Sequence, residues 1–527
     1  MAAVPVRIMA RVAAYGLAGA ALFGVYLRLS GTGAENADMA NILLMASDLR
    51  HGNLLLHGWY VSDVSFYTTE LPQYALLEFF LGVGMRTAHV AAAMTYTLAL
   101  LLAVMLARGG TSGRQALTRT LVAAGIMLAP QLGGGVYALD MAVGHIGTSV
   151  PLLLTWLLLD RARPRWWVPA LVAVMLAWAL VADPLVIVAG VLPLATASTV
   201  RVIKGLASDR AQWYEMSLIG AAAAAAGLAW AAGWLLRAHG GYVEHAVHLS
   251  VRSPRDLRGA LAAIWQILDL FGADFHQLSG LELFFAILHL VSVGLVAWAL
   301  LRVAARFFGH VTLTDQVLAL AIAGGATAYL VTTESQQGAH EIALIEPFAA
   351  ALAARTLAGP ASLAGAAARS GTVALAGTGR RVLTAGYLAG ALVLAGYTAG
   401  LGYELSQPSA SPQYAGLASW LAAHHLTDGL ASYWDSSSVT VDSGGLVTVR
   451  ALRQTTMQPY LWMSDKAWYE PGTHRATFLV LDDQPGYSPD WPMSRIVGCF
   501  GRPDRVYHTG PYTVLVWRHD LLRNIPR

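Results

Sequence analysis

The sequence predicts a polytopic α-helical membrane protein with a small extracytoplasmic α/β domain at its C-terminal end. Its 527 residues are 56% hydrophobic and only 12% charged, with a mean hydropathy of +0.52, which is too apolar for a soluble protein of this size. Apolar runs that could cross a hydrocarbon core of about 30 Å recur from residue 8 to residue 403. From about Tyr403 onward, short β-type runs between turns replace them.

About eleven apolar runs are candidate membrane spans. The first follows Arg7 and Arg11, and only Arg28 near its end interrupts it. Its length of about 18 residues exceeds the roughly 7–15 residues of a signal-peptide core, so we interpret it as an uncleaved anchor. The predicted spans cover residues 8–29, 88–107, 117–133, 147–160, 166–182, 184–199, 214–236, 281–301, 315–332, 340–358 and 382–403.

The placement of lysine and arginine predicts how these spans are oriented. Basic residues crowd every second loop, from the 108–119 loop to the loop that holds Arg380 and Arg381. The loops between them carry acids and histidines instead. Because cytoplasmic loops are enriched in Lys and Arg, we expect a multi-pass plasma-membrane protein with a cytoplasmic N-terminus and an extracytoplasmic C-terminus.

One apolar stretch is too short to be a span. It runs from Pro72 to Gly84, about 13 residues, a length that suits a helix lying in the membrane interface or re-entering it. Counting it as a crossing would place the arginines of the 108–119 loop outside and break the charge pattern.

The composition changes after the last span. Residues 406–412 form a Ser/Pro-rich linker. We therefore expect a transmembrane domain over residues 1–403, whose outer loop 30–87 carries juxtamembrane helices, and an extracytoplasmic α/β domain over residues 404–527. The second domain is predicted to contain a helix at Tyr414–His425 and strands at Ala431–Tyr433, Val439–Val441, Leu446–Val449, Phe478–Leu481 and Tyr512–Trp517.

The outer loop 30–87 holds the candidate catalytic carboxylates, Asp38 and Glu70. Asp38 begins a helix-like stretch that ends at Arg50, where an aspartate serves either as an N-cap or dipole partner or as a general base in a group of acids. Glu70 and Pro72 open the short apolar helix, so Glu70 either caps that helix or faces the same pocket as Asp38. Candidate substrate-binding residues in the same loop are Glu35, Asp48 and His57.

Other outer segments supply further candidate substrate-binding residues. Asp140 and His145 lie in the second outer loop, five residues apart; this is not a strong metal-ligand spacing, and a polar wall is the alternative to a metal site. Arg255 and Arg258 are cations on the expected outer side, where they bind either a phosphate or lipid headgroups. His340 and Glu341 stand at the outer edge of a span and are expected to line a cavity.

Composition excludes several classes of site. The single cysteine, Cys499, rules out an internal disulfide and a thiolate metal cluster. Basic residues are scattered over helix ends without a stripe or motif, so no nucleic-acid partner is expected. No cofactor is required, and no pattern indicates a divalent cation.

The order of parts resembles the membrane glycosyltransferases of the GT-C superfamily, nearest the protein O-mannosyltransferase and lipid A aminoarabinose transferase type. The resemblance rests on Asp38 after the first span, on Glu70-Leu-Pro72 before an apolar helix, and on the run from Tyr433-Trp434-Asp435 to Val447. Met39 stands where the family usually has a second acid, and the single Pro72 replaces a common Pro-Pro.

The resemblance implies an enzyme that transfers a hexosyl or pentosyl group. A polyprenyl-phosphate sugar would be the donor, and a glycan, lipid or protein outside the cytoplasm the acceptor. Asp38 would be the general base for an inverting attack through an oxocarbenium-like state. Arg255, Arg258 or His340 could stabilise the departing phosphate.

Two other functions remain as alternatives. A non-catalytic membrane scaffold would use the outer domain as a binding module. A transporter would show two similar halves with ionisable groups near the bilayer midplane, whereas the acids here lie at the outer ends of the spans.

Overall fold

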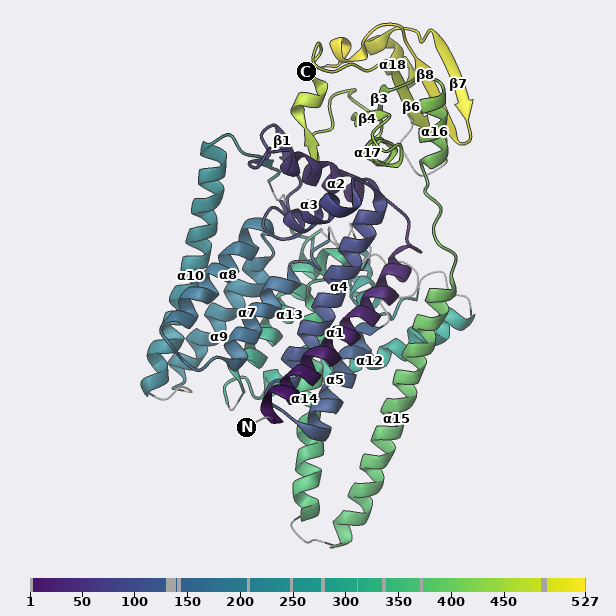
Figure 1. Cartoon of the computed structure of the whole chain (residues 1–527). Coiled ribbons are helices and arrows are strands. Elements are labelled where there is room, and N and C mark those ends of the chain that lie inside the picture. The colour runs from purple at the N-terminus through teal and green to yellow at the C-terminus, as the bar shows by residue number, and fades with distance from the viewer. Residues whose placement is uncertain are drawn as a thin grey trace. The chain divides into compact units, whose positions relative to one another are not determined.

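The chain folds into two compact units in a computed structural model (Figure 1). The model describes residues 3–128, 139, 144–205, 209–246, 250–275, 280–309, 311–333, 338–369, 373–484 and 491–526. One unit, called here the helical unit, comprises residues 1–32, 92–231 and 248–408. The other, called the mixed unit, joins residues 33–91 and 232–247 to the C-terminal module, residues 409–527.

Every predicted span overlaps a helix. These helices are α1 (Ala3–Ser30), α4 (Met85–Arg108), α5 (Gly113–Leu128), α7 (Ser149–Arg161), α8 (Trp167–Ala182), the π-helix η2 (Ile187–Val191) with α9 (Leu192–Ile203), α10 (Asp209–Ala238), α12 (Gly280–Ala305), α13 (Leu313–Val331), the 3₁₀ turn η4 (Ala339–Ile342) with α14 (Ile345–Arg369), and α15 (Val373–Ser406). The amphipathic α11 (Leu257–Leu270) is an additional helix.

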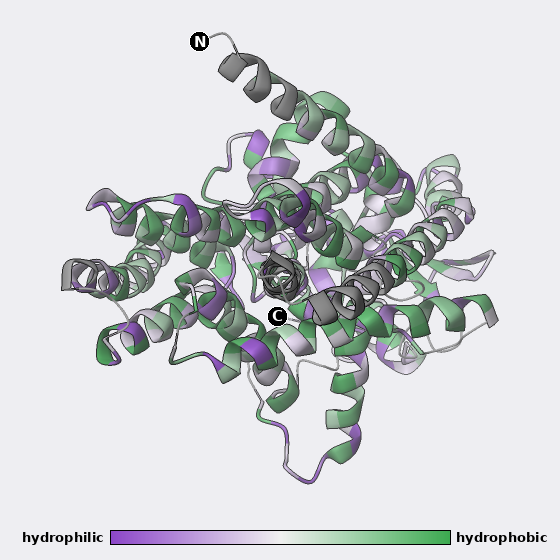
Figure 2. Cartoon of the chain, turned by 90° about the horizontal axis from the view of Figure 1, so that it is seen from below, coloured by the Kyte–Doolittle hydropathy of each residue, from purple (hydrophilic) through white to green (hydrophobic). Residues whose placement is uncertain are grey.

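Six helices in the described part of the chain are long and apolar enough to cross a membrane. They contain the segments Ala13–Ser30, Met85–Arg108, Gln212–Ala238, Gly280–Ala305, Leu313–Val331 and Gly386–Ser406. Two shorter apolar segments, Trp167–Ala182 and Ile187–Ile203, fall below that length. The cartoon coloured by hydropathy shows that the described helices consist largely of hydrophobic residues (Figure 2). The prediction of a membrane protein with many helices is thus supported, while the figure of eleven crossings stays a prediction.

The first part of the helix α14 lies in the core of the helical unit. Every residue from Ile345 to Ala354 is buried, and the helix packs against α5, α12 and α13. A helix that is buried on all sides belongs in the interior of a bundle. Arg355 follows this stretch and lies 2.9 Å from Asp160 and 2.5 Å from Asp315, so it ties the ends of α7 and α13 to α14.

The C-terminal module is a sheet covered on both faces. The strands β3 (Asp428–Ala431), β4 (Thr448–Ala451), β6 (Phe478–Asp482), β7 (Arg505–Thr509) and β8 (Tyr512–Val516) lie in the order β4-β3-β6-β8-β7. Alternate residues of β6 enter two different hydrophobic clusters. One cluster contains residues of α16 (Ala415–Ala423) and α17 (Tyr433–Asp442), and the other contains α18 (Met493–Phe500) and the 3₁₀ turn η6 (Leu521–Asn524).

Two strand predictions in this module are corrected. The predicted strand at Val439–Val441 is wrong, because these residues belong to α17. The β-branched run favours a strand locally, but α17 packs against both β4 and α2, and the adjacent small serines Ser436–Ser438 are buried. The predicted strand at Ala431–Tyr433 ends at Ala431, since Tyr433 already begins α17.

A three-stranded sheet assembles the mixed unit from distant parts of the chain. The strand β1 (Trp59–Val61) pairs in parallel with β2 (Val243–Glu244) and antiparallel with β5 (Ser464–Asp465). A Cβ atom on Gly58 would lie 2.4 Å from Oδ1 of Asp465, and Gly58 has a φ of +88°. Only glycine therefore permits this close approach of the first outer loop to the C-terminal module.

The short apolar helix is α3 (Glu70–Leu81), as the sequence predicts, and it packs against α2 (Ala37–Arg50). In α3 large apolar side chains are exposed and an acidic side chain is buried, which is the opposite of a soluble amphipathic helix. Phe79 and Phe80 are each 71% exposed, whereas Glu78 is 2% exposed. Exposed phenylalanines around a buried acid suit a helix whose outer face meets lipid.

Candidate functional site

Asp38 lies in the first turn of α2 and does not cap it. The cap is Asn36, whose Oδ1 accepts a hydrogen bond of 2.9 Å from the backbone N–H of Met39. The N-cap interpretation of Asp38 is therefore wrong. Its carboxylate still benefits from the positive end of the helix dipole, because it lies within the first turn.

The C-terminal module contributes a hydrogen-bond partner of Asp38. The hydroxyl of Tyr433, the first residue of α17, donates a hydrogen bond to Oδ1 of Asp38. One turn further along both helices, Ser437 donates to Oδ1 of Asn41 at 2.5 Å. The rings of Tyr433 and Tyr460 lie 5.1 Å apart, centroid to centroid. The carboxylate of Asp38 thus lies beside a neutral donor, the Tyr433 hydroxyl, whose ring packs near that of Tyr460.

Glu35 precedes α2 and is partly buried. Burial, together with the nearby negative charge of Asp442, raises the pKa of Glu35 to about 7. Burial also raises the pKa of Asp442. A carboxyl group that titrates near neutrality can exchange protons at working pH, and Glu35 lies three residues from Asp38 in the chain.

Two other predicted substrate-binding residues form hydrogen bonds that fix the conformation of the 30–87 loop. Oδ2 of Asp48 accepts hydrogen bonds from the indole of Trp59 at 2.7 Å and from the side-chain amide of Asn53 at 3.0 Å. Nδ1 of His57 donates to the backbone carbonyl of Gly240 at 2.7 Å. Both side chains are therefore engaged in hydrogen bonds within the mixed unit, although His57 is exposed.

Glu70 is buried at the start of α3, in the same unit as Asp38. Its carboxylate accepts a hydrogen bond from the hydroxyl of Thr69, and its charge acts on Tyr74. Two turns later burial raises the pKa of Glu78 to about 8, although Arg50 at 3.9 Å opposes the shift. The packing of α2 on α3 places Asp38 and Glu70 on neighbouring helices. A shared cavity for the two carboxylates stays a prediction.

A second cluster joins loops of the helical unit that the sequence left separate. Nδ1 of His145 lies 2.8 Å from Oδ2 of Asp183, and Nε2 lies 3.1 Å from Oε2 of Glu341. Asp183 also accepts a hydrogen bond of 2.6 Å from the hydroxyl of Thr148. His340 completes the group, with Nε2 at 3.4 Å from Oε1 of Glu341. We call these four residues, His145, Asp183, His340 and Glu341, the histidine–carboxylate cluster.

The charges in this cluster stabilise one another. Burial alone lowers the pKa of His145, but the charge and hydrogen bond of Asp183 and the contact with Glu341 outweigh it, so the pKa lies well above its usual value. Burial opposes ionisation of Asp183 and Glu341, yet their hydrogen bonds and charge pairing with His145 bring both pKa values below the ordinary range. An imidazolium that donates from both ring nitrogens matches this arrangement.

The remaining predicted residues occupy other places. Asp140 lies outside the described residues. Arg255 and Arg258 are exposed before and at the start of α11. Arg252 is buried instead, where it donates to the carbonyl of Thr332 at 2.9 Å and to Asp256 at 2.9 Å. No three histidine, cysteine or acidic side chains among the described residues are arranged to hold a metal ion.

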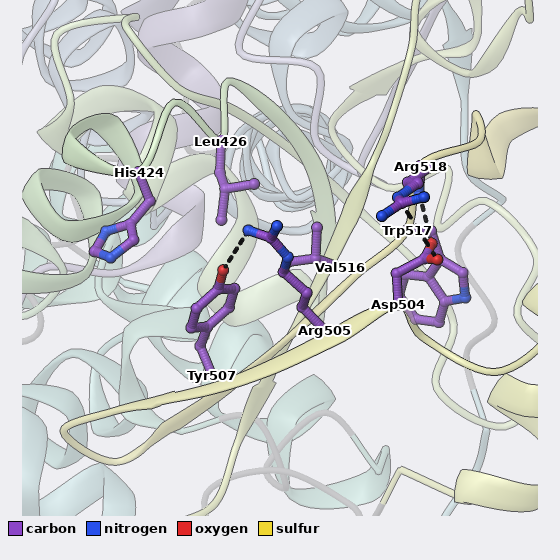
Figure 3. A pocket seen from close by; sticks show the side chains of 8 residues that line it. All are labelled: His424, Leu426, Asp504, Arg505, Tyr507, Val516, Trp517 and Arg518. Carbon is purple, nitrogen blue, oxygen red and sulfur yellow. Dashed lines mark hydrogen bonds and ion pairs between the residues drawn. The ribbon is translucent and has the colours of Figure 1, made fainter.

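A separate pocket of about 200 Å³ opens on the C-terminal module (Figure 3). Arg505 there donates to the hydroxyl of Tyr507 at 3.2 Å, and Arg518 lies 3.9 Å from Asp504. Both guanidinium groups thus have partners already. The pocket is lined by His424, Leu426, Asp504, Arg505, Tyr507, Val516, Trp517 and Arg518, and it includes none of the predicted site residues.

Three residues of these sites were not predicted as functional. Tyr433 entered only as part of the C-terminal resemblance, and Asp183 was not singled out from the sequence. Asn41 carries a signal that could have indicated it, because it lies one helical turn after Asp38 on the same face. Nothing local to Tyr433 indicates a partner 395 residues away.

A solved structure matches the fold over nearly the whole chain. ArnT from Cupriavidus metallidurans superimposes with a TM-score of 0.55 over 97% of this chain and 98% of its own, at 13% sequence identity. The chain therefore shares the fold of ArnT. Two structures of the Archaeoglobus fulgidus oligosaccharyltransferase AglB, one apo and one with an inhibitory peptide and a dolichol-phosphate, match with TM-scores of 0.48 and 0.47.

The AglB matches are 14% and 12% identical, and each covers 89% of this chain and 69% of AglB. ArnT and AglB are membrane glycosyltransferases. No model of a protein family and no curated protein matches the sequence. At 13% identity the likeness to ArnT establishes the fold alone, and this fold agrees with the resemblance drawn from the sequence.

Proposed function

We propose that this protein is an integral membrane glycosyltransferase that moves a sugar from a polyprenyl-phosphate donor to an acceptor outside the cytoplasm. The observation that carries the proposal is the position of Asp38. It is a half-buried carboxylate in the first turn of the helix after the first span, in a chain whose GT-C fold extends over 97% of its length. A base at that place could reach an acceptor at the membrane surface.

The reaction needs little more than a base and a site for a phosphate. Asp38 accepts the proton of the acceptor hydroxyl, whose oxygen attacks the anomeric carbon. The bond from that carbon to the phosphate oxygen breaks, and polyprenyl phosphate leaves with the electron pair. Attack opposite the leaving group inverts the anomeric centre through an oxocarbenium-like state. The phosphate is already a good leaving group, so no strong general acid is required.

The other candidate residues receive supporting roles. Glu70 is proposed as the second catalytic carboxylate, and Glu35 as an acid near neutrality in the same unit. Asp48 and His57 would shape the substrate-binding loop through their hydrogen bonds. In the helical unit, the exposed Arg255 and Arg258 are proposed to hold the donor phosphate, while His145, His340, Glu341 and Asp140 would form a polar wall.

A membrane scaffold is the second candidate function. The contact between Tyr433 and Asp38 favours it, because a carboxylate that already holds the C-terminal module in place has a structural role without any chemistry. Met39, where the GT-C pattern usually has a second acid, points the same way. The two functions differ in whether loss of the Asp38 charge abolishes a reaction or only weakens the packing of α17 on α2.

The orientation in the membrane is tested by reporter fusions. We expect alkaline phosphatase fused at Pro412, between α15 and α16, to be active, because this position follows the last predicted span and should lie outside. A fusion at Lys204, after α9 in a basic loop, should be inactive and serves as the matched control. A green fluorescent protein that fluoresces at Pro412 and not at Lys204 would overturn the proposed topology.

The transferase function is tested in a strain that lacks the gene. We expect one polyprenyl-phosphate sugar to accumulate and one extracytoplasmic glycoconjugate to lose that sugar, as measured by mass spectrometry of extracted lipids and cell-envelope glycans. The wild-type gene should restore both, and a gene with Asp38→Asn should restore neither. If the lipid-linked sugars are unchanged while membrane complexes fall apart, the scaffold function is the better account.

A further inference from the structure

We infer that Tyr433 of the C-terminal module is a positioning residue that fixes the carboxylate of Asp38 for proton transfer. The inference rests on the proposed function, in which Asp38 is the general base. It assigns the C-terminal module a direct part in the reaction site.

The contact is built by two packed helices. The helix α17 packs against α2, and their first turns carry Tyr433 and Asp38 respectively. The second contact, from Ser437 to Asn41, lies one turn later on both helices. Because two successive turns are joined, the position of Tyr433 relative to Asp38 does not depend on a single flexible side chain.

The hydrogen bonds in this contact run in one direction. Ser437 donates to the carbonyl oxygen of Asn41, which directs the Asn41 amide group for donation elsewhere. The amide of Asn41 favours the ionised phenol of Tyr433, although burial and the charge of Asp38 outweigh it. Tyr433 gives its only proton to Asp38. Both hydrogen bonds thus run from α17 to α2, and the one from Tyr433 ends on the carboxylate.

Burial keeps Tyr433 a donor. Tyr433 is 9% exposed, Asn41 2% and Ser437 3%. Burial, followed by the charge of Asp38 and the hydrogen bond to it, raises the pKa of Tyr433 well above its usual value. The phenol thus stays protonated at working pH, and the ring is confined by its contacts with Tyr460 and Trp434. A fixed donor of this kind restricts rotation of the carboxylate, which is the requirement for efficient proton abstraction.

The test compares two buried tyrosines in the full-length protein. Tyr433→Phe removes the donor to Asp38. Tyr469→Phe is the matched control: Tyr469 is 8% exposed in the same module, and its hydroxyl donates to the carbonyl of Ala451 at 2.7 Å. Transfer is measured in membranes of the deletion strain with radiolabelled farnesyl-phosphate arabinose and farnesyl-phosphate mannose as probes, using whichever the wild type consumes.

We expect Tyr433→Phe to lower kcat by roughly tenfold or more, because a hydrogen bond to a charged group is lost, while KM for the donor changes by less than about twofold. Tyr469→Phe should leave both constants near the wild-type values. Ser437→Ala, which removes the second hydrogen bond between α17 and α2, should lower kcat less and leave KM unchanged. Ser437→Ala provides the same test if Tyr433→Phe fails to fold.

The outcomes separate this inference from the proposed function. Wild-type kcat in both Tyr433→Phe and Ser437→Ala, with Asp38→Asn inactive, overturns the positioning role and leaves the general base in place. Equal losses in Tyr433→Phe and Tyr469→Phe, accompanied by the same fall in melting temperature, also overturn it, because they indicate a structural effect. Full transfer by Asp38→Asn would overturn the proposed function itself.

Discussion

Replacing Asp38 with asparagine should abolish sugar transfer while the protein folds and binds its donor normally. The amide keeps the size of the side chain and can still accept a hydrogen bond from Tyr433 through its oxygen, but it cannot take the proton of an acceptor hydroxyl. Because general-base catalysis contributes roughly 100- to 10,000-fold, we expect the rate to fall to background. The measurement is the release of polyprenyl phosphate from a lipid-linked sugar in membranes.

The stability of this variant should change little. Asn36 caps α2, so the cap survives the substitution. The loss of a charge at the helix N-terminus and of a charged hydrogen bond together cost about 1 kcal/mol. Asp504→Asn is the control: it makes the same chemical change on the exposed surface of the C-terminal module and should leave transfer intact. A wild-type rate in Asp38→Asn would show that another group is the base.

Replacing His145 with alanine should give the largest loss of stability in the helical unit. Its side chain is 9% exposed and pairs with Asp183, which is 1% exposed. Removing the imidazolium leaves the buried carboxylate of Asp183 without its cation, and breaking a buried pair in this way costs about 3–5 kcal/mol. Thermal unfolding in detergent should show a melting temperature several degrees lower. Asp183→Asn should cost a similar amount, and the double variant should cost less than the sum.

The effect of His145 should depend on pH in a defined direction. The pKa of His145 is raised in the folded state, so its stabilisation is complete below the unfolded value of about 6.5 and is lost as the pH rises through the folded value. The pKa values of Asp183 and Glu341 are lowered, so their contribution is present above about pH 4 and is lost on further acidification. The difference in melting temperature between wild type and His145→Ala should therefore be greatest between about pH 4.5 and 6.5. A constant difference from pH 4 to 9 would contradict the ion-pair account.

The sequence by itself predicted the parts of the structure that depend on local patterns. Each predicted span overlaps a helix. About twenty consecutive apolar residues are long enough to cross the hydrocarbon core as a helix, and a helix pairs its own backbone N–H and C=O groups where no water is present. The short helix α3 followed from its length in the same way. Asp38 was indicated as a site residue by its place after the first span, and the GT-C resemblance followed from the order of such parts.

Only the tertiary structure decided which distant residues meet. The strands β1, β2 and β5 contain three, two and two residues, which is too short for a period-two pattern to identify them. Residues Val439–Val441 have a strand-like sequence pattern but form part of the helix α17, because this helix packs against α2 and β4. Asp183, His145 and Glu341 come from three loops, and Tyr433 reaches Asp38 from the other end of the chain. A local sequence pattern depends only on residues that are near one another in the chain. The contacts described above join distant residues, because a buried polar group cannot bind water and must pair with the polar groups that the fold places beside it.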